Sequence, residues 1–242
     1  MTATETGRPA LADQPPDAAT STTACPPGSD LVRLSARFGL AFTIAQLTVM
    51  VAMVTIVLPH GGSPGSGALD RGRSVLEVQE LYRVGNYAFM LAGTLLLGFL
   101  GAVAVHLRRV DASGVLAVVA VSSGALLALV WPLGGLLHDV ALEAASAGSD
   151  LRLLGGWDSV APYTLALSVL PRTFFVGAIV LGLRRAGTAP WLQRTGWVLL
   201  PIGLVGSAVT ITAAVFPLLA LSTLGYELWV GFLAWHWLRG QR

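Results

Sequence analysis

The chain has 242 residues, of which 54% are hydrophobic and only 12% are charged, and its mean hydropathy is +0.71; soluble domains usually contain about 25% charged residues. The formal net charge of +2 is too small to indicate a protein that binds nucleic acid. Cys25 is the only cysteine, which excludes a disulfide within the chain and a metal site built from several thiolates.

The chain divides into a polar tail and a long apolar part. Residues 1–30 contain no aromatic residue and are rich in Ala, Thr, Pro and Asp, so we predict a disordered cytoplasmic tail. Residues 31–242 contain six apolar runs, each of about the 20 residues that cross about 30 Å of hydrocarbon. The sequence predicts an all-α fold, a polytopic membrane helix bundle with six transmembrane helices near 38–59, 86–107, 114–138, 159–183, 196–216 and 217–238.

The arginines indicate how this bundle is oriented. If the amino terminus lies in the cytoplasm, ten arginines fall in segments on the cytoplasmic side, four fall on the outer side, and Arg172 lies within a span. Cytoplasmic segments of membrane proteins carry an excess of basic residues. We therefore predict a multi-pass protein of the cell membrane with both termini in the cytoplasm.

Two of the connections predicted to lie outside are long. The first begins with the turn-rich segment 60–73 and continues as 74–85, where apolar residues alternate with charged ones at helical spacing. We predict a short amphipathic surface helix there. The second connection, 138–159, is acidic and has room for another surface helix. Short inner turns and long outer loops favour a cavity that opens outward.

Arg172 and Glu227 are the ionisable residues placed most deeply in the predicted spans. A charged side chain at the centre of a membrane helix costs about 2.5–3.5 kcal/mol on insertion scales and usually faces a partner inside the bundle. The neighbours of Glu227 at helical spacing, from Ala220 to Ala234, are small, so another helix can approach closely. Pro171 leaves a carbonyl of its helix without its usual donor, next to Arg172. Two interpretations stay open: a structural salt bridge, or the floor of a substrate or proton site.

Other polar and aromatic residues are candidates for the same centre. Gln46 is the least easily satisfied of the polar residues within the spans, and we take it as a third member. The side chains of Asn86, Tyr87, Trp131, Tyr163 and Tyr226 are predicted in the outer half of the bundle, either as pocket-lining residues or as anchors at the membrane interface. No metal-ligand pattern, phosphate-binding glycine motif or nucleophile motif occurs, so we predict no metal and no cofactor.

The second half of the chain resembles a known family. The resemblance covers 170-LPRTFFVGAIVLG-182, 189-APWLQRTGWVLLPIGLVG-206 and 224-LGYELWVGFLAWHWLRG-240. These segments are similar to a bacterial family of small six-helix integral membrane proteins that is catalogued as a domain of unknown function. Family members carry an Arg in the fourth helix and a Glu in the sixth, which correspond to Arg172 and Glu227. They usually have Asn before that Glu, where this chain has Tyr226. The resemblance implies six helices and a paired Arg and Glu, and it implies no activity.

These observations lead to three hypotheses about function. The first is a non-catalytic membrane protein, either an accessory protein or a small-molecule-binding module with Arg172 and Glu227 at its centre. The second is an intramembrane enzyme, such as a cyclase or isomerase, that acts on a lipophilic substrate with Glu227 as acid or base and Arg172 orienting it. The third is a proton-coupled exporter. The expected partners are membrane lipids and a lipophilic small molecule, with no nucleic acid. The sequence does not indicate an oligomeric state.

Overall fold

The computed structural model describes residues 29–52, 55, 67–148, 150–158 and 161–240. Within these ranges the secondary structure is helical, with no strand. In chain order the helices are α1 (Ser29–Ala52), α2 (Ala68–Glu77), α3 (Gln79–Val110), α4 (Val115–Ser146), α5 (Leu151–Asp158), α6 (Ala161–Arg185), α7 (Pro190–Gly206), the 3-10 turns η3 (Ser207–Thr210) and η4 (Ala213–Val215), and α8 (Phe216–Arg239).

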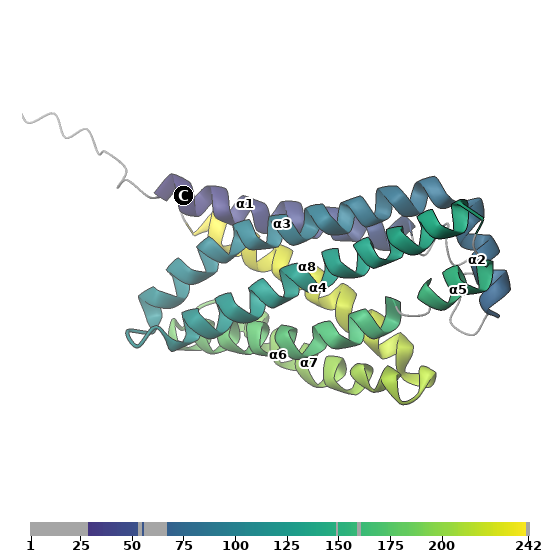
Figure 1. Cartoon of the computed structure of the whole chain (residues 1–242). Helices are drawn as coiled ribbons and strands as arrows, with labels where there is room; N and C mark the ends of the chain where they lie inside the picture. The colour runs from purple at the N-terminus through teal and green to yellow at the C-terminus, as the bar shows by residue number, and fades with distance from the viewer. Residues whose placement is uncertain (1–28, 53–54, 56–66, 149, 159–160, 241–242) are drawn as a thin grey trace, which may run out of the picture.

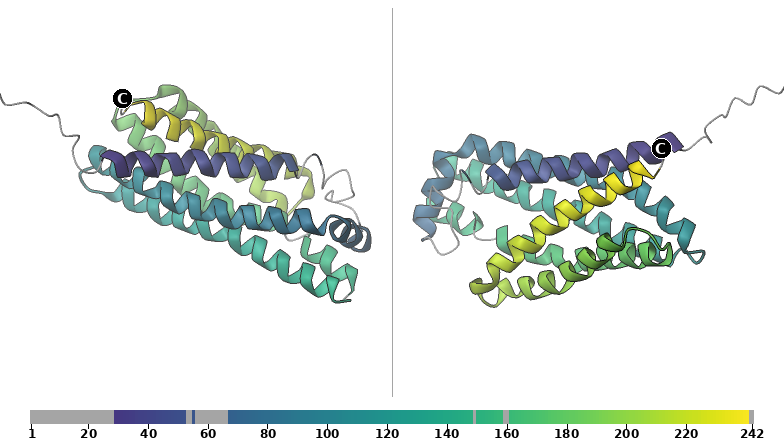
Figure 2. Two further views of the ribbon diagram at one scale, coloured as in Figure 1. Left: turned by 90° about the horizontal axis from the view of Figure 1, so that it is seen from above. Right: turned by 180° about the vertical axis from the view of Figure 1, so that it is seen from behind.

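The long helices lie roughly along one direction and pack around a shared core (Figure 1). Neighbouring pairs follow the order α1, α3, α4, α6, α7, α8, and α8 in turn packs against α1. In Figure 2, α8 crosses the bundle diagonally and ends beside the start of α1. This path brings the middle of α8 close to both α1 and α6, which are far apart in the sequence.

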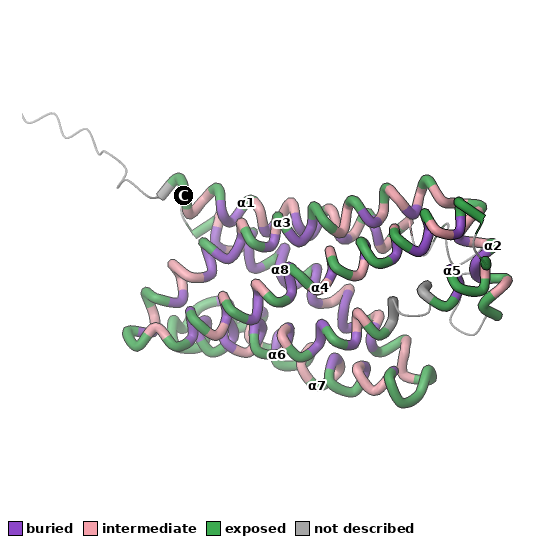
Figure 3. The backbone as a smooth tube through the Cα atoms, in the orientation of Figure 1, coloured by how far each residue is buried: buried purple, intermediate pink, exposed green. Residues whose placement is uncertain are grey.

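Five helices are long and apolar enough to cross a membrane. They occupy Asp30–Ala52, Gln79–Val110, Val115–Ser146, Tyr163–Arg185 and Ala213–Arg239. Figure 3 shows that each long helix turns a buried stripe inward, and many of the exposed side chains are large and apolar, for example Leu129 and Phe174. An apolar exterior around a packed interior is the pattern expected of helices surrounded by lipid.

The segment predicted as the fifth span, 196–216, differs from the structure at both ends. Helix α7 begins earlier, with Pro190 in its first turn, where the fixed φ of proline suits a helix start. It ends at Gly206 after 17 residues, and two 3-10 turns follow. Gly206 lies against the backbone of Leu219, 2.7 Å from where a Cβ would stand, which permits a tight reversal into α8. A crossing of the membrane by α7 therefore stays a prediction.

The predicted surface helix at 74–85 is wrong as a separate element. The chain bends at Val78, whose φ of −117° and ψ of 30° are not helical, so residues before it belong to α2 and residues after it belong to α3. Val75 and Tyr82 pack with Leu142 and Leu154 in a small core apart from the main one. That core explains why α3 and α4 extend well beyond the predicted spans. Residues 60–66 lie outside the described part of the chain.

Helix α5 confirms the second predicted surface helix, and it packs against α2 at one end of the bundle (Figure 1). Two glycines let these helices touch. A Cβ on Gly72 would clash with the carbonyl of Leu151, and a Cβ on Gly155 would clash with the carbonyl of Ala68. We call the pair α2 and α5 the end cap.

At the opposite end of α3, Asp111 organises the turn into α4. Its carboxylate accepts hydrogen bonds from the backbone N–H of Leu116 at 2.9 Å and from the hydroxyl of Ser113 at 2.7 Å, and it forms an ion pair with Arg185 at 3.0 Å. The N–H of Leu116, then the Ser113 hydroxyl and, more weakly, Arg185 hold the pKa of Asp111 below its usual value of 3.8, although partial burial opposes them. Asp111 thus joins the start of α4 to the end of α6.

Candidate functional site

Arg172 and Glu227 both lie near the middle of their helices, α6 and α8, and both are buried. The guanidinium of Arg172 donates through Nη1 to Thr223 Oγ1 at 3.0 Å and through Nη2 to Ser168 Oγ at 2.7 Å. Its Cζ also lies 5.0 Å from the centre of the Tyr226 ring, within the range of a cation–π contact. The cation is thus held by two hydroxyls and an aromatic face.

The two hydroxyls that accept from Arg172 are themselves anchored to the helix backbones. Ser168 donates to the carbonyl of Leu165 at 2.6 Å, and Thr223 donates to the carbonyl of Leu219 at 2.9 Å. Each hydroxyl has one proton and two lone pairs, so donating to a carbonyl leaves the lone pairs for the guanidinium. The arrangement fixes the position of Arg172 without a carboxylate.

A direct salt bridge between Arg172 and Glu227 was one of the two interpretations of the sequence. The structure brings both residues into one cluster, but none of the ion pairs among the described residues joins them. The reason is geometric, because the guanidinium reaches Thr223, one turn before Glu227 on α8, and lies against the ring of Tyr226. The Glu227 carboxylate therefore forms no ion pair with any residue that the structure describes.

Tyr226 is the centre of the cluster. Its ring has edge-to-face contacts with Phe42 at 6.4 Å, Trp131 at 6.1 Å and Phe175 at 6.2 Å between ring centroids. Phe42 and Trp131 also stack on each other at 5.5 Å. These rings come from α1, α4, α6 and α8, so Tyr226 and Trp131 lie inside the bundle, as the pocket-lining interpretation requires, and not at its surface.

Gln46 joins the cluster through the packing of α1 on α8. Gly39 lies against Ala234, and Thr43 lies against Gly231, so the two helices are antiparallel. Thr43 Oγ1 also donates to the backbone carbonyl of Glu227 at 2.9 Å. One turn further along α1, Gln46 comes to the level of Glu227, and its side chain is buried. Gln46 thus lies buried at this level of the bundle, and its role as a third member of the centre stays a prediction.

The cluster contains polar atoms that are buried and have no hydrogen-bond partner within the described part of the chain. There are six of them: Gln46 Nε2 and Oε1, Trp131 Nε1, Arg172 Nε, Tyr226 Oη and Glu227 Oε2. A buried donor or acceptor without a partner costs about 1–3 kcal/mol. Folded proteins rarely leave such groups together unless they serve a function or meet an additional partner.

Three residues predicted to line a pocket lie elsewhere. Tyr87 is 66% exposed and Tyr163 is 51% exposed, so both face away from the cluster, as the interface interpretation expects. Asn86 is buried, but its Nδ2 donates to Asp139 Oδ1 at 2.6 Å, between α3 and α4. Adjacent residues on a helix point about 100° apart, which separates Asn86 from Tyr87.

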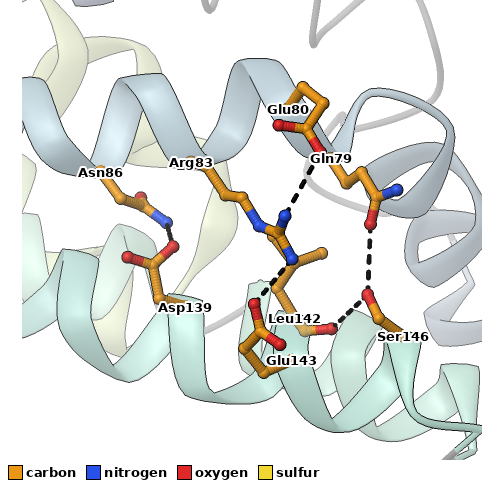
Figure 4. Close-up of polar contacts among 8 residues, drawn as sticks. All are labelled: Gln79, Glu80, Arg83, Asn86, Asp139, Leu142, Glu143 and Ser146. Atoms are coloured by element: carbon orange, nitrogen blue, oxygen red, sulfur yellow. Dashed lines mark hydrogen bonds and ion pairs between the residues drawn. The ribbon is translucent and has the colours of Figure 1, made fainter.

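Asn86 belongs to a row of polar contacts that the sequence analysis missed (Figure 4). Arg83 pairs with Glu143 at 2.6 Å and with Glu80 at 3.3 Å, and the Ser146 hydroxyl donates to Gln79 at 3.2 Å. We call this row the α3–α4 ladder. Its members recur every three or four residues on both helices, and this spacing was a signal in the sequence that could have revealed it.

The cluster offers both hydrogen-bond donors and acceptors, one cation and one carboxyl group. Within the described ranges no three His, Cys, Asp or Glu residues gather as a metal site, and His60 lies outside those ranges. The donors, acceptors, cation and carboxyl group of the cluster are suited to polar recognition and proton transfer in an apolar surrounding. No family model, curated protein or solved structure matches the chain.

Proposed function

We propose that this protein is a multi-pass protein of a bacterial cytoplasmic membrane that binds a small lipophilic molecule at the cluster around Tyr226. The membrane part rests on the five long apolar helices and on the arginine distribution. The resemblance to the six-helix family of unknown function is consistent with this proposal, in which α7 supplies a sixth crossing and both termini are cytoplasmic.

The single observation that carries the binding role is the group of six buried polar atoms without partners. They come from α1, α4, α6 and α8, the four helices whose aromatic rings meet at Tyr226. A purely structural centre in lipid gains most when its polar groups satisfy one another. Here Ser168 and Thr223 are satisfied, while Glu227, Gln46 and Trp131 retain binding capacity. A molecule with polar atoms would supply the missing partners.

Native mass spectrometry with extraction of bound lipids tests this proposal. The purified wild-type protein is compared with Glu227→Gln and with the control Glu143→Gln, which removes a carboxylate from the α3–α4 ladder. We expect the same lipophile to co-purify with the wild type and the control and to be lost from Glu227→Gln. If the wild type carries no specific molecule and Glu227→Gln is destabilised, the role of the cluster is structural. A protein partner would then be sought instead.

One observation also favours an intramembrane enzyme as a second candidate. A carboxyl group in a tight ion pair with arginine is a poor proton donor, because the cation favours the ionised form. Glu227 is in no such pair among the described residues, and its Oε2 has no partner there. It is therefore suited to act as acid or base on a lipophilic substrate. This candidate fails if the molecule that co-purifies is recovered chemically unchanged after prolonged incubation with both the wild type and Glu227→Gln.

A further inference from the structure

The charges of the cluster limit what it can bind. Arg172 and Glu227 are buried, and the other buried arginine, histidine and carboxylic acid side chains in the described chain, Arg71, Asp111 and His138, lie towards the ends of the bundle. The positive charge of the Arg172 guanidinium and the negative charge of the Glu227 carboxylate nearly cancel in this apolar surrounding. A ligand with a net charge would upset that balance and would also lose its own hydration.

The unpartnered atoms also define which hydrogen bonds a ligand could form in the cluster. Donors remain on Arg172 Nε, Trp131 Nε1 and Gln46 Nε2, and acceptors remain on Gln46 Oε1 and Glu227 Oε2. The hydroxyl of Tyr226 can serve either way. A ligand with only acceptors would leave the carboxylate unmatched, and a ligand with only donors would leave the guanidinium unmatched.

We infer that the site takes an uncharged lipophile whose polar head carries both a hydrogen-bond acceptor and a donor, such as an amide or a hydroxy ketone. The acceptor of the head meets Arg172 and Trp131, and its donor meets Glu227. The rings of Phe42, Trp131 and Phe175 provide the apolar surface beside the head. This inference rests on the proposed binding function and adds the chemical class of the ligand.

Four probes with the same tail and different heads test the class directly: decanamide, decanoate, decylamine and methyl decanoate. Their retention by the wild-type protein is measured by equilibrium dialysis against protein-free micelles of a neutral detergent. We expect decanamide to bind about tenfold more tightly than methyl decanoate, which lacks a donor, and more tightly than either charged probe. This ranking needs no variant to fold. Tightest binding of decanoate or decylamine, or equal binding of all four, overturns the inference.

Two charge variants give a stricter test. Glu227→Gln leaves Arg172 as the remaining charge, so we expect decanoate to become the preferred probe. Arg172→Gln leaves Glu227, so we expect decylamine to be preferred. Glu143→Gln, in the α3–α4 ladder, is the control and should keep the wild-type ranking. A ranking that both cluster variants leave unchanged contradicts the inferred site, whereas a folded wild type that retains none of the probes, and no lipophile on purification, contradicts the proposed function itself.

Discussion

Arg172 is a buried cation whose hydrogen-bond acceptors are hydroxyl groups. Thr223 and Ser168 each accept one of its hydrogen bonds, and each hydroxyl is oriented by its own bond to a helix carbonyl. These neutral acceptors pair with Nη1 and Nη2 without neutralising the cation, and they leave Nε without a partner among the described residues. Two consequences follow: Glu227 is left available, and the position of Arg172 depends strongly on both hydroxyls.

Replacing Thr223 by Val tests that dependence. Valine keeps the shape of threonine but removes the acceptor, so a buried Arg172 N–H loses its partner. We expect the free energy of unfolding in detergent to fall by about 1–3 kcal/mol. Thr94→Val is the matched control, because Thr94 is exposed and donates only to its own helix, at Met90. Its effect should stay within about 0.5 kcal/mol. Equal effects at the two positions would show that the Thr223 bond contributes little to stability.

At the scale of single elements, the end cap depends on two glycines that the apolar pattern did not single out. Alanine at Gly155 would place its Cβ against the carbonyl of Ala68, a backbone atom that cannot move without shifting α2. We expect Gly155→Ala to lower the unfolding free energy by about 1–3 kcal/mol and to expose α2 to proteolysis.

The neighbouring residue provides the control for this prediction. Gly156 lies on the same helix with open space where a Cβ would stand. Gly156→Ala should therefore be neutral or stabilise α5, by at most about 1 kcal/mol, because alanine favours helix more than glycine does. If Gly155→Ala stabilises the protein as Gly156→Ala does, α2 and α5 do not pack closely at Gly155.

Asp111 gives the turn between α3 and α4 a dependence on pH. Its pKa in the folded protein lies below 3.8, chiefly because the N–H of Leu116 stabilises the carboxylate. A lowered folded pKa adds stability above about pH 4 and loses it as the pH falls through the folded value. We expect Asp111→Asn to be less stable than the wild type at neutral pH and to approach it in acid. If the stability difference between the wild type and Asp111→Asn grows as the pH falls, the pKa of Asp111 is not lowered in the folded protein.

The sequence predicted the helices of the core well because a bilayer demands long apolar runs, and such runs are visible residue by residue. It predicted the ends of α3 and α4 poorly. The small core of Val75, Tyr82, Leu142 and Leu154 stabilises these ends together with the polar contacts of the α3–α4 ladder, and both depend on how the helices pack, which hydropathy does not report. The burial of Arg172 and Glu227 followed from their place in the spans. The pairing of Arg172 with Thr223 and the Tyr226 ring did not, since it depends on how α6 and α8 face each other.

For the whole molecule, the path of α7 relative to the membrane decides on which side the carboxyl terminus lies. Its 17 residues are shorter than the usual span of about 20, but two 3-10 turns continue the segment before α8 begins. With α7 as a crossing, the protein has six spans and both termini lie on one side. With five spans, the termini lie on opposite sides of the membrane.

Cysteine labelling with a membrane-impermeant maleimide separates these two arrangements. Cys25 is the single native cysteine and marks the amino-terminal tail, while Cys25→Ser combined with Gly240→Cys marks the end of α8. We expect both cysteines to react only when the cytoplasmic face is opened, because the arginine distribution predicts both ends there and six crossings would return the chain to its starting side. Labelling of the Gly240→Cys protein from outside, with Cys25 protected, would mean five crossings. It would also place α7 along the membrane surface, and the ring of helices around Tyr226 would then lie open to lipid on the α7 side.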